Sequence, residues 1–153
     1  MNAKFSSHVL KLPELLAALR ASPKAPVRGG APHSKEGGIY VLYENGLPLH
    51  VGRTRNLRKR LIGHTSRSHY SASFAFKQTR YQLGEVKASY KPEGSRAALV
   101  LDPIFGPAFL QQVERVRSMQ VQFLAVTEPI DQYLLELYAA LELGLALDEF
   151  DTH

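Results

Sequence analysis

The sequence predicts an α+β fold in which a small antiparallel three-stranded sheet is flanked by helices. The first observation behind this prediction is a hairpin signal, Asn45-Gly46, between two short runs of β-prone residues. The second is a further β-prone run at residues 119–126, whose second half is apolar on both faces, as in a central strand. The third is that apolar residues recur at helical spacing before the hairpin, after it and near the end of the chain.

Length and composition are those of an ordinary globular protein. The 153 residues suit one core, with 44% hydrophobic and 22% charged residues. We divide the chain into residues 1–35, an N-terminal helix and a Pro/Gly-rich arm, and residues 36–153, the main domain. There is no cysteine, which excludes disulfides and thiolate chemistry and suits the cytoplasm, where we expect the protein. No apolar run approaches the roughly 20 residues of a membrane span, so we expect no membrane partner.

The elements before the hairpin are predicted from spacing and from Pro and Gly. Leucines at helical intervals come after the N-terminus, and Pro13 suits a first turn, so we predict an amphipathic helix that ends at Ser22-Pro23. Residues 22–37 are rich in Pro and Gly and are predicted to form a linker or arm. The leucines of this helix are Leu12, Leu15, Leu16 and Leu19.

The register of the hairpin depends on which residues must share a face. A loop of residues 44–46 with Gly46 left-handed makes one face of the ribbon wholly apolar, and we therefore predict that loop. Tyr40 then lies directly across from His50 on the other face, so two side chains able to transfer protons are adjacent. The predicted pairs on the apolar face are Tyr43 with Leu47, Val41 with Leu49, and Ile39 with Val51.

The elements after the hairpin are mainly helices. Residues 54–64 are predicted to be helical, with Leu57 and Leu61 on the buried side. Asn56, Arg60 and His64 recur at intervals of four residues and are predicted to share one stripe of that helix. The other expected elements are a loop at 87–94, a short helix at 96–101, a helix at 107–117 that buries Leu110, and a last helix from Pro129.

Residues 66–84 fit two structures. Tyr70, Phe74 and Tyr81 fit one face of a helix that ends at Gly84, whereas Phe74 and Phe76 alternate as in a strand, and we favour the helix. Its aromatic residues, among basic ones, either stack on bases or belong to the core, which is the commoner role.

The last helix is expected to be covered on more than one side. Leu135, Ala139 and Leu143 line much of the helix outside its main stripe. The main buried stripe is expected to be Ile130, Tyr133, Leu134, Leu137, Tyr138 and Leu141.

Charge is distributed unevenly along the chain. The formal net charge is +5, yet no Lys or Arg occurs after Arg117, whereas half of the 14 acidic residues lie there. Residues 45–84 contain no Asp or Glu, and a surface of one sign suits a polyanion such as DNA. The basic residues of that stretch are Arg53, Arg55, Arg58, Lys59, Arg60, Arg67, Lys77 and Arg80.

The hairpin and the basic segment after it carry an ordered set of motifs. Gly38-Ile39-Tyr40 is succeeded by His50-Val51-Gly52, and later by a tyrosine-rich helical segment at residues 133–140, YLLELYAA. Between them stand Thr54, Asn56, Leu57, Arg60 and His64. This set resembles the GIY-YIG nuclease family, and the late segment resembles the family's late helix. The resemblance implies a GIY-YIG-like fold for residues 36–153 and a metal-dependent endonuclease that hydrolyses DNA phosphodiester bonds with an activated water.

The resemblance also implies roles for single residues. Glu136 would be the one protein ligand of a divalent cation, Mg²⁺ or Mn²⁺, with Glu142 as the alternative if the helix is rotated. Arg60 would contact the non-bridging phosphate oxygens with its planar guanidinium. Asp148 stands where the family tends to have an asparagine. We expect the substrate to be bound by Gly52, Thr54, Asn56, Arg58 and His64. Within this set, His64 is expected either to orient a phosphate or to brace Arg60, and Gly52 to permit close approach of the backbone.

The general base has two candidates. An unperturbed tyrosine has a pKa near 10, so only about one Tyr40 in a thousand would be phenolate at pH 7 unless cations lower that pKa. His50 stands where the family usually has tyrosine, and an unperturbed histidine suits general-base work near neutral pH. We therefore expect His50 either to take the proton itself or to share it with Tyr40.

Two other functions fit the same sequence. The first is a nucleic-acid-binding module on this scaffold that no longer cleaves, because of His50 and Asp148. The second is an interaction protein whose basic surface meets an acidic partner. DNA is the expected partner under the leading hypothesis, and a homo-oligomer is open.

Overall fold

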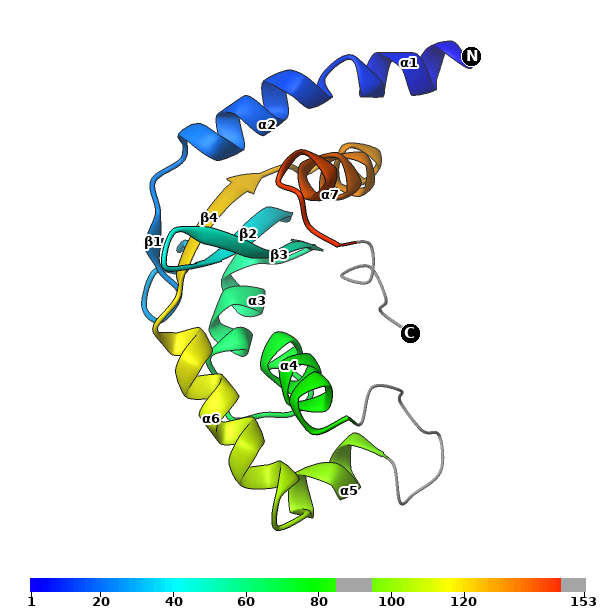
Figure 1. Ribbon diagram of the computed structural model, residues 1–153. Helices are drawn as coiled ribbons and strands as arrows, with labels where there is room; N and C mark the ends of the chain where they lie inside the picture. Colours follow the sequence, from blue (N-terminus) through cyan, green and yellow to red (C-terminus); the bar gives the residue numbers. More distant parts are fainter. Residues whose placement is uncertain (85–94, 147–153) are drawn as a thin grey trace.

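The computed structural model describes residues 1–84 and 95–146 (Figure 1). Its centre is a four-stranded antiparallel sheet with the strand order β1-β4-β2-β3. The α+β class and the antiparallel sheet are confirmed, whereas the expected number of three strands is wrong. The fourth strand is β1, two residues within the predicted arm that pair with β4. The strands are β1 (Ala25–Pro26), β2 (Gly38–Glu44), β3 (Leu47–Thr54) and β4 (Gln120–Ala125).

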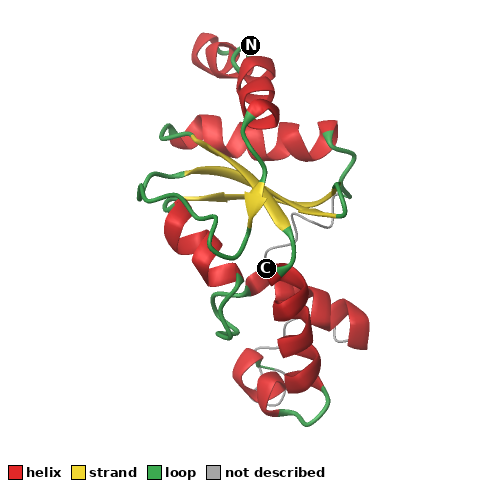
Figure 2. Cartoon of the chain, turned by 90° about the vertical axis from the view of Figure 1, so that its left-hand side faces the viewer, coloured by secondary structure: helices red, strands yellow, loops and turns green. Residues whose placement is uncertain are grey.

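Helices cover both faces of this sheet (Figures 1 and 2). Helices α2 and α7 lie over one face, with α1 continuing beyond α2, whereas α3, α4 and α5 lie on the other side at increasing distance from the sheet and α6 runs back from α5 to β4. Two predicted features, the loop at 87–94 and Asp148, lie outside the described residues. The helices are α1 (Ala3–Val9), α2 (Leu12–Ala21), α3 (Leu57–His64), α4 (Ser73–Leu83), α5 (Arg96–Leu101), α6 (Phe105–Arg117) and α7 (Pro129–Glu142).

Strand β2 contributes to two hydrophobic clusters because its side chains alternate between the faces. Tyr40 and Leu42 belong to the cluster that contains Leu57 and Leu61 of α3 and the aromatic residues of α4 and α6. Ile39, Val41 and Tyr43 belong to the cluster formed with α2 and α7. The basic helix and the last helix therefore pack on opposite faces of the strand that carries Tyr40.

The hairpin turn differs from the predicted three-residue loop. Asn45 and Gly46 both have positive φ, 51° and 79°, and form a two-residue loop in which Glu44 is paired with Leu47. Leu49 then has no partner in β2, because Tyr43 is paired with Pro48 and Leu42 with His50. The extra residue in β3 shifts its side chains by one position, so that apolar side chains of β2 and β3 share a face again, which a two-residue loop without a bulge would not allow.

The bulge changes the partner of Tyr40. Tyr40 is paired with Gly52, and His50 with Leu42, so the predicted direct Tyr40–His50 pair is wrong. Residues 50 and 52 still point to one face of β3, and Tyr40 and His50 therefore remain diagonal neighbours on the same face, with ring centroids 5.8 Å apart.

Gly52 provides the space that the Tyr40 ring occupies. A Cβ atom at Gly52 would overlap the phenol oxygen and the adjacent ring carbons of Tyr40. The close approach that we expected Gly52 to allow is therefore made by this ring. The ring is fully buried as a result, and its hydroxyl is directed toward α3.

Replacing Gly52 with Ala should destabilise the protein by about 1–3 kcal/mol, the usual effect of inserting a methyl group into a packed site. The reason is that the added Cβ overlaps Tyr40, so either the ring or strand β3 must shift. Urea unfolding of the variant measures this loss, and Gly46→Ala, where a Cβ meets nothing but φ is positive, is the control for backbone strain alone. A Gly52 variant as stable as the wild type would contradict the packing described here.

Helix α3 begins immediately after β3 because its first turn is capped. The Asn56 side chain accepts a hydrogen bond from the backbone N–H of Lys59 at 2.9 Å. The backbone N–H of Leu57 donates to Glu36 O at 2.9 Å, which fastens the start of the helix to the segment before β2. These contacts set the direction in which Arg60 and His64 leave the helix.

The helices at the two ends of the chain pack together on one face. Leucines of α2 lie in the same buried cluster as Leu135 and Ala139 of α7, and α2 ends at Ser22 as predicted. In α1, His8 Nδ1 lies 2.6 Å from a carboxylate oxygen of Asp131 in the first turn of α7. The N-terminal helix is therefore held by both apolar and polar contacts.

The buried face of α7 differs in part from the predicted one. Leu135 and Ala139 are buried as expected, and Leu134 and Tyr138 of the predicted stripe are partly buried against the same cluster. Tyr133, Leu137 and Leu141, expected in the buried stripe, are 58%, 46% and 56% exposed. The helix is rotated toward its small and polar residues, because two alanines allow close approach to the sheet and polar side chains there find partners. The buried residues are Asp131, Gln132, Leu135, Ala139 and Ala140.

Two smaller differences concern the middle helices. Helix α4 ends at Gly84 in the left-handed conformation, as the sequence indicates, but its buried aromatics are both Phe74 and Phe76. Tyr70 precedes this helix and is 69% exposed. In α6, Leu110 is 41% exposed, and the prediction that it is buried was wrong. No helix among residues 1–84 and 95–146 is long and apolar enough to cross a membrane.

Candidate active site

The hydroxyl group of Tyr40 joins strand β2 to helix α3. Arg60 Nε donates to this oxygen at 3.2 Å, and His64 Nε2 lies 2.8 Å from it. An arginine only donates, so the phenol oxygen accepts from Arg60. His64 Nε2 either accepts the phenol proton or donates to the phenol oxygen, according to its tautomer, and among the described residues its buried Nδ1 has no hydrogen-bond partner. The sequence placed Asn56, Arg60 and His64 on one helical stripe, and the last two meet at Tyr40.

Burial keeps this cluster neutral apart from Arg60. The pKa of Tyr40 is raised above its ordinary value of 10.0, chiefly by burial, although the charge and hydrogen bond of Arg60 lower it. Burial, then the charge of Arg60 and the nearby His50, hold the pKa of His64 well below its ordinary value of 6.5. At neutral pH the pair is thus a phenol and an uncharged imidazole.

Stability should fall in mild acid because of His64. Its pKa is lowered in the folded protein, so below about pH 6.5 the unfolded chain binds a proton that the folded protein does not. This contribution is complete above pH 6.5 and is lost by at most about 1.4 kcal/mol per pH unit as the pH falls toward the folded pKa. Urea unfolding of wild type and His64→Gln between pH 5 and 8 measures it. Parallel profiles of the two proteins would contradict the assignment.

His50 stands beside this cluster on the same side of the sheet. Its ring centroid is 6.1 Å from that of His64 and 5.2 Å from that of Phe74 of α4. Its exposure is intermediate, whereas Tyr40 and His64 are fully buried. Of the two candidates for general base, His50 is therefore the one with a surface open to solvent.

Glu136 of α7 reaches the site at the edge strand. Its carboxylate lies 3.3 Å from Arg53 Nε, and the Arg53 guanidinium stacks on Tyr133, 3.7 Å from the ring centroid. The pKa of Glu136 is raised by burial, while the charge and hydrogen bonds of Arg53, and then the charge of Arg60, lower it. Ala139 and Ala140, about one turn further along α7, are buried.

The position of β3 explains how Glu136 and Tyr40 come near each other from opposite sides of the sheet. Strand β3 is the last in the sheet, and Arg53 comes directly after Gly52, the partner of Tyr40. At this edge the Glu136 carboxylate accepts hydrogen bonds from both the backbone N–H and the side chain of Arg53. The charge of Glu136 raises the pKa of Tyr40, so the two groups are electrostatically coupled. The edge of β3 thus brings the carboxylate toward the Tyr40 cluster.

The residues expected to bind substrate are engaged in local structure. Thr54 Oγ1 accepts from the backbone N–H of Asn56 at 3.1 Å, and the Asn56 side chain caps α3. Arg58 donates to the carbonyl oxygen of Pro32 at 3.4 Å, which connects α3 to the segment before β2. His64 is buried against Tyr40, so the expectation that it braces the site fits better than a direct phosphate contact.

Two residues near the site were not singled out from the sequence. Arg53 appeared there only as one of many basic residues, yet it holds Glu136. Arg96 of α5 stacks on Phe76, and burial and then the charge of Arg60 lower its pKa. No local pattern indicated these two, because each acquires its position from packing between elements. Tyr70, which the sequence placed on a buried helical face, instead precedes α4 and lines a hollow beside Arg60.

A metal would have one carboxylate here. Within the described ranges, no three His, Asp or Glu side chains gather to form a ready metal cluster. Mg²⁺ often uses one or two carboxylates and completes its coordination with water and substrate phosphate oxygens. Glu136, a partly buried carboxylate beside a cationic side chain, fits that mode if Arg53 releases it. No protein-family model, curated protein or solved structure matches the chain.

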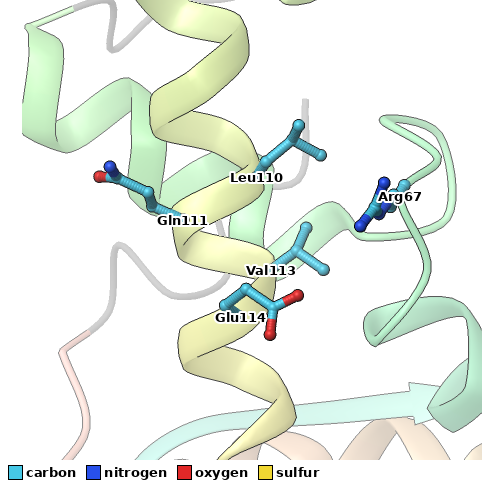
Figure 3. A pocket seen from close by; sticks show the side chains of 5 residues that line it. All are labelled: Arg67, Leu110, Gln111, Val113 and Glu114. Carbon is cyan, nitrogen blue, oxygen red and sulfur yellow. The ribbon is translucent and has the colours of Figure 1, made fainter.

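Two hollows flank the site and a third lies apart. The hollow of about 440 Å³ beside Arg60 and the hollow of about 290 Å³ beside Arg53 share Arg55 in their walls. Figure 3 shows the third, of about 190 Å³, where Arg67 faces the apolar side chains of α6. Its acidic residue, Glu114, is already paired with Arg117 at 2.6 Å. The third hollow therefore offers little chemistry.

Proposed function

We propose that the protein is a divalent-metal-dependent endonuclease of the GIY-YIG type, which hydrolyses DNA phosphodiester bonds with an activated water. The observation that carries the proposal is the contact of Arg60 and His64 with the Tyr40 hydroxyl, at 3.2 and 2.8 Å. His50 faces the same cluster, and Glu136 is coupled to it electrostatically. Phosphodiester hydrolysis uses this combination of a base, a cationic clamp and a carboxylate that holds a cation.

Arg60 would bind the scissile phosphate. Its Nε is fixed by Tyr40, which leaves the terminal nitrogens of the guanidinium to contact two non-bridging oxygens. Such contacts stabilise the charge that builds up on these oxygens in the transition state. Tyr40 and His64 then act as positioning residues. Tyr40 holds the guanidinium through its hydroxyl, His64 holds that hydroxyl, and both side chains are buried.

His50 would accept the proton of the attacking water. It is the more exposed of the two candidate bases, and burial raises the pKa of Tyr40, which makes phenolate rarer still at neutral pH. Neutral imidazole accepts a proton readily near pH 7. Glu136 would hold Mg²⁺ or Mn²⁺ once Arg53 has turned away. A bound cation supplies polarisation of the phosphoryl oxygen and stabilisation of the departing oxygen.

Incubation with supercoiled plasmid tests the proposal. In Mg²⁺ or Mn²⁺ the wild-type protein should convert supercoiled plasmid to open-circular or linear forms, and EDTA should stop this. Because single preparations are easily contaminated, the activity should elute with the protein through two chromatography steps. Plasmid that stays intact in both metals, at protein concentrations that bind it, would overturn the nuclease proposal.

The pH dependence of cleavage should identify the base. If His50 accepts the proton, the wild-type rate rises with pH as this one group loses its proton and then levels off. His50→Phe should lose that rise and about 100- to 10,000-fold in rate. Tyr40→Phe should keep the rise and lose less. Single-turnover rates of cleavage measure this, and an unchanged profile in His50→Phe would remove His50 from the mechanism.

A DNA-binding protein that does not cleave is the second candidate. The Arg53–Glu136 ion pair favours it, because a carboxylate already paired is less free to hold a cation. Binding of DNA with intact plasmid in both metals is the result that would select this candidate.

A further inference from the structure

A hollow beside Arg60 combines an exposed aromatic ring with cationic walls. Its volume is about 440 Å³, within the range of small-molecule sites, and Tyr70 and Arg60 both line it. The other charged residues in its walls are Arg55 and Lys59. Residues 45–84, which supply every one of these walls, include no acidic residue. The hollow is therefore suited to an anionic ligand that has a flat ring.

The ring of Tyr70 is exposed and is held in place by its neighbours, as a ring that stacks on a ligand must be. Its side chain is largely outside the core, at 69% exposure, although large apolar rings are usually covered. The His69 ring lies behind it, with centroids 4.1 Å apart, and the carbonyl of His69 accepts from Arg96 at 3.1 Å. The platform is thus supported from α5 rather than left on a free loop, so less ordering is required when a ligand binds.

A nucleotide has the chemistry that this hollow would recognise. Aromatic side chains stack on bases, and cations beside them contact the phosphates on either side. A base inside a duplex is covered on both faces by its neighbours, so only an unpaired or extruded base can stack on a protein ring. Because Arg60 belongs both to this hollow and to the candidate active site, that base would lie next to the scissile phosphate.

We propose that the hollow formed by Tyr70, Arg55, Lys59 and Arg60 binds an unpaired nucleotide of DNA adjacent to the cleaved bond, which makes partly single-stranded DNA the preferred substrate class. This inference rests on the proposed function for its choice of ligand. It goes beyond that function because neither the contact of Arg60 with a phosphate nor general-base catalysis by His50 requires unpaired DNA. Duplex DNA with a short unpaired segment, or single strands, supplies such a nucleotide.

Binding measured in EDTA tests the inference without any cleavage. The probes are a fluorescent blunt-ended duplex of two fully paired strands and the same duplex with a gap of three unpaired nucleotides, the gapped probe, and anisotropy gives each Kd. Tyr70→Ala should weaken binding of the gapped probe about 5- to 100-fold, the usual effect of losing one stacked base, and change the paired probe less than about twofold. Tyr70→Phe should retain wild-type affinity because it keeps the ring.

Two comparisons separate stacking from other effects. Tyr81→Ala, a matched tyrosine that is 39% exposed outside the hollow, should leave both affinities unchanged. A gapped probe whose unpaired nucleotides lack their bases should bind wild type and Tyr70→Ala equally. Tyr70→Ala should also leave the salt dependence of Kd unchanged, whereas Lys59→Ala should reduce its slope by about one.

Tyr70→Ala that weakens binding of the paired and gapped probes equally, or of neither, would overturn the inference. So would a loss of affinity in Tyr70→Ala for the probe without bases.

Thermal unfolding checks that Tyr70→Ala is folded. Tyr70→Leu, which keeps apolar bulk without an aromatic face, should lose affinity for the gapped probe as Tyr70→Ala does. The proposed function fails separately, through intact plasmid. If Tyr70→Ala weakens binding of the gapped probe but the protein does not cleave DNA, the nucleotide site holds and the nuclease proposal fails. If the protein cleaves DNA but Tyr70→Ala binds the gapped probe like the wild type, the nuclease proposal holds and the nucleotide site fails.

Discussion

Glu136→Gln should lower the rate of metal-dependent DNA cleavage by about 1000-fold or more. The carboxylate is the group in the candidate site that can hold a hard cation, and a metal typically supplies several kcal/mol of transition-state stabilisation. Burial raises the pKa of Glu136, so the folded protein already tolerates a less charged group there, and the neutral amide should fold normally. DNA binding in EDTA should be unchanged or tighter, because one negative charge is removed from the site.

Glu142→Gln is the matched control for this experiment. Glu142 is the last residue of the same helix, is exposed, and its backbone carbonyl accepts from Arg20 at 3.3 Å, away from Arg53. Its variant should cleave at the wild-type rate. Equal cleavage by the two variants would remove Glu136 from the chemistry, and loss confined to the Glu142 variant would reassign the cation to that residue.

Arg60→Lys should reduce cleavage by about 100- to 1000-fold although it keeps the positive charge. A lysine cannot present a planar fork to two phosphate oxygens while it also donates to Tyr40 from a fixed nitrogen. Arg67→Lys, at an arginine outside the cluster, is the matched control and should retain full activity. A lysine variant at 60 that cleaves like the wild type would show that only charge is needed.

A second measurement on the Arg60 variants does not depend on activity. Arg60 lowers the pKa of both Tyr40 and His64, so Arg60→Ala should raise both. NMR titration of the His64 ring protons measures this shift directly. His64 that titrates as in the wild type would contradict the contact geometry, whatever the cleavage rate.

Local patterns predicted a large part of the fold. Alternation placed Tyr40 and His50 on one face, and helical spacing placed Arg60 and His64 on one stripe; both arrangements are present. The hairpin register was wrong because a β-bulge shifts the parity of a strand by one residue, and Asn45-Gly46 signals a turn without indicating a bulge in the next strand. Alternation can therefore predict the face of the sheet on which a side chain lies even where it cannot predict the residue paired with it on the next strand.

The last helix shows a different limit. Counting apolar residues favoured the stripe through Tyr133 and Leu137, but both are exposed, and the side of the helix that is fully buried carries Leu135, Ala139 and Ala140. Small residues contribute little to a hydrophobic pattern, although they allow the closest packing against a sheet. The ion pair between Arg53 and Glu136 was missed for the same reason: it depends on how α7 is rotated against β3, which no single segment specifies.

The central claim is that one phosphate can meet Arg60, His50 and a cation on Glu136 together. Anomalous scattering from Mn²⁺ in crystals of the protein with an uncleavable phosphorothioate DNA tests this most directly. The account predicts a manganese peak at the Glu136 carboxylate, with Arg53 displaced and Arg60 on the same phosphate. A peak elsewhere, or an Arg53–Glu136 ion pair that persists with metal and DNA bound, would contradict it.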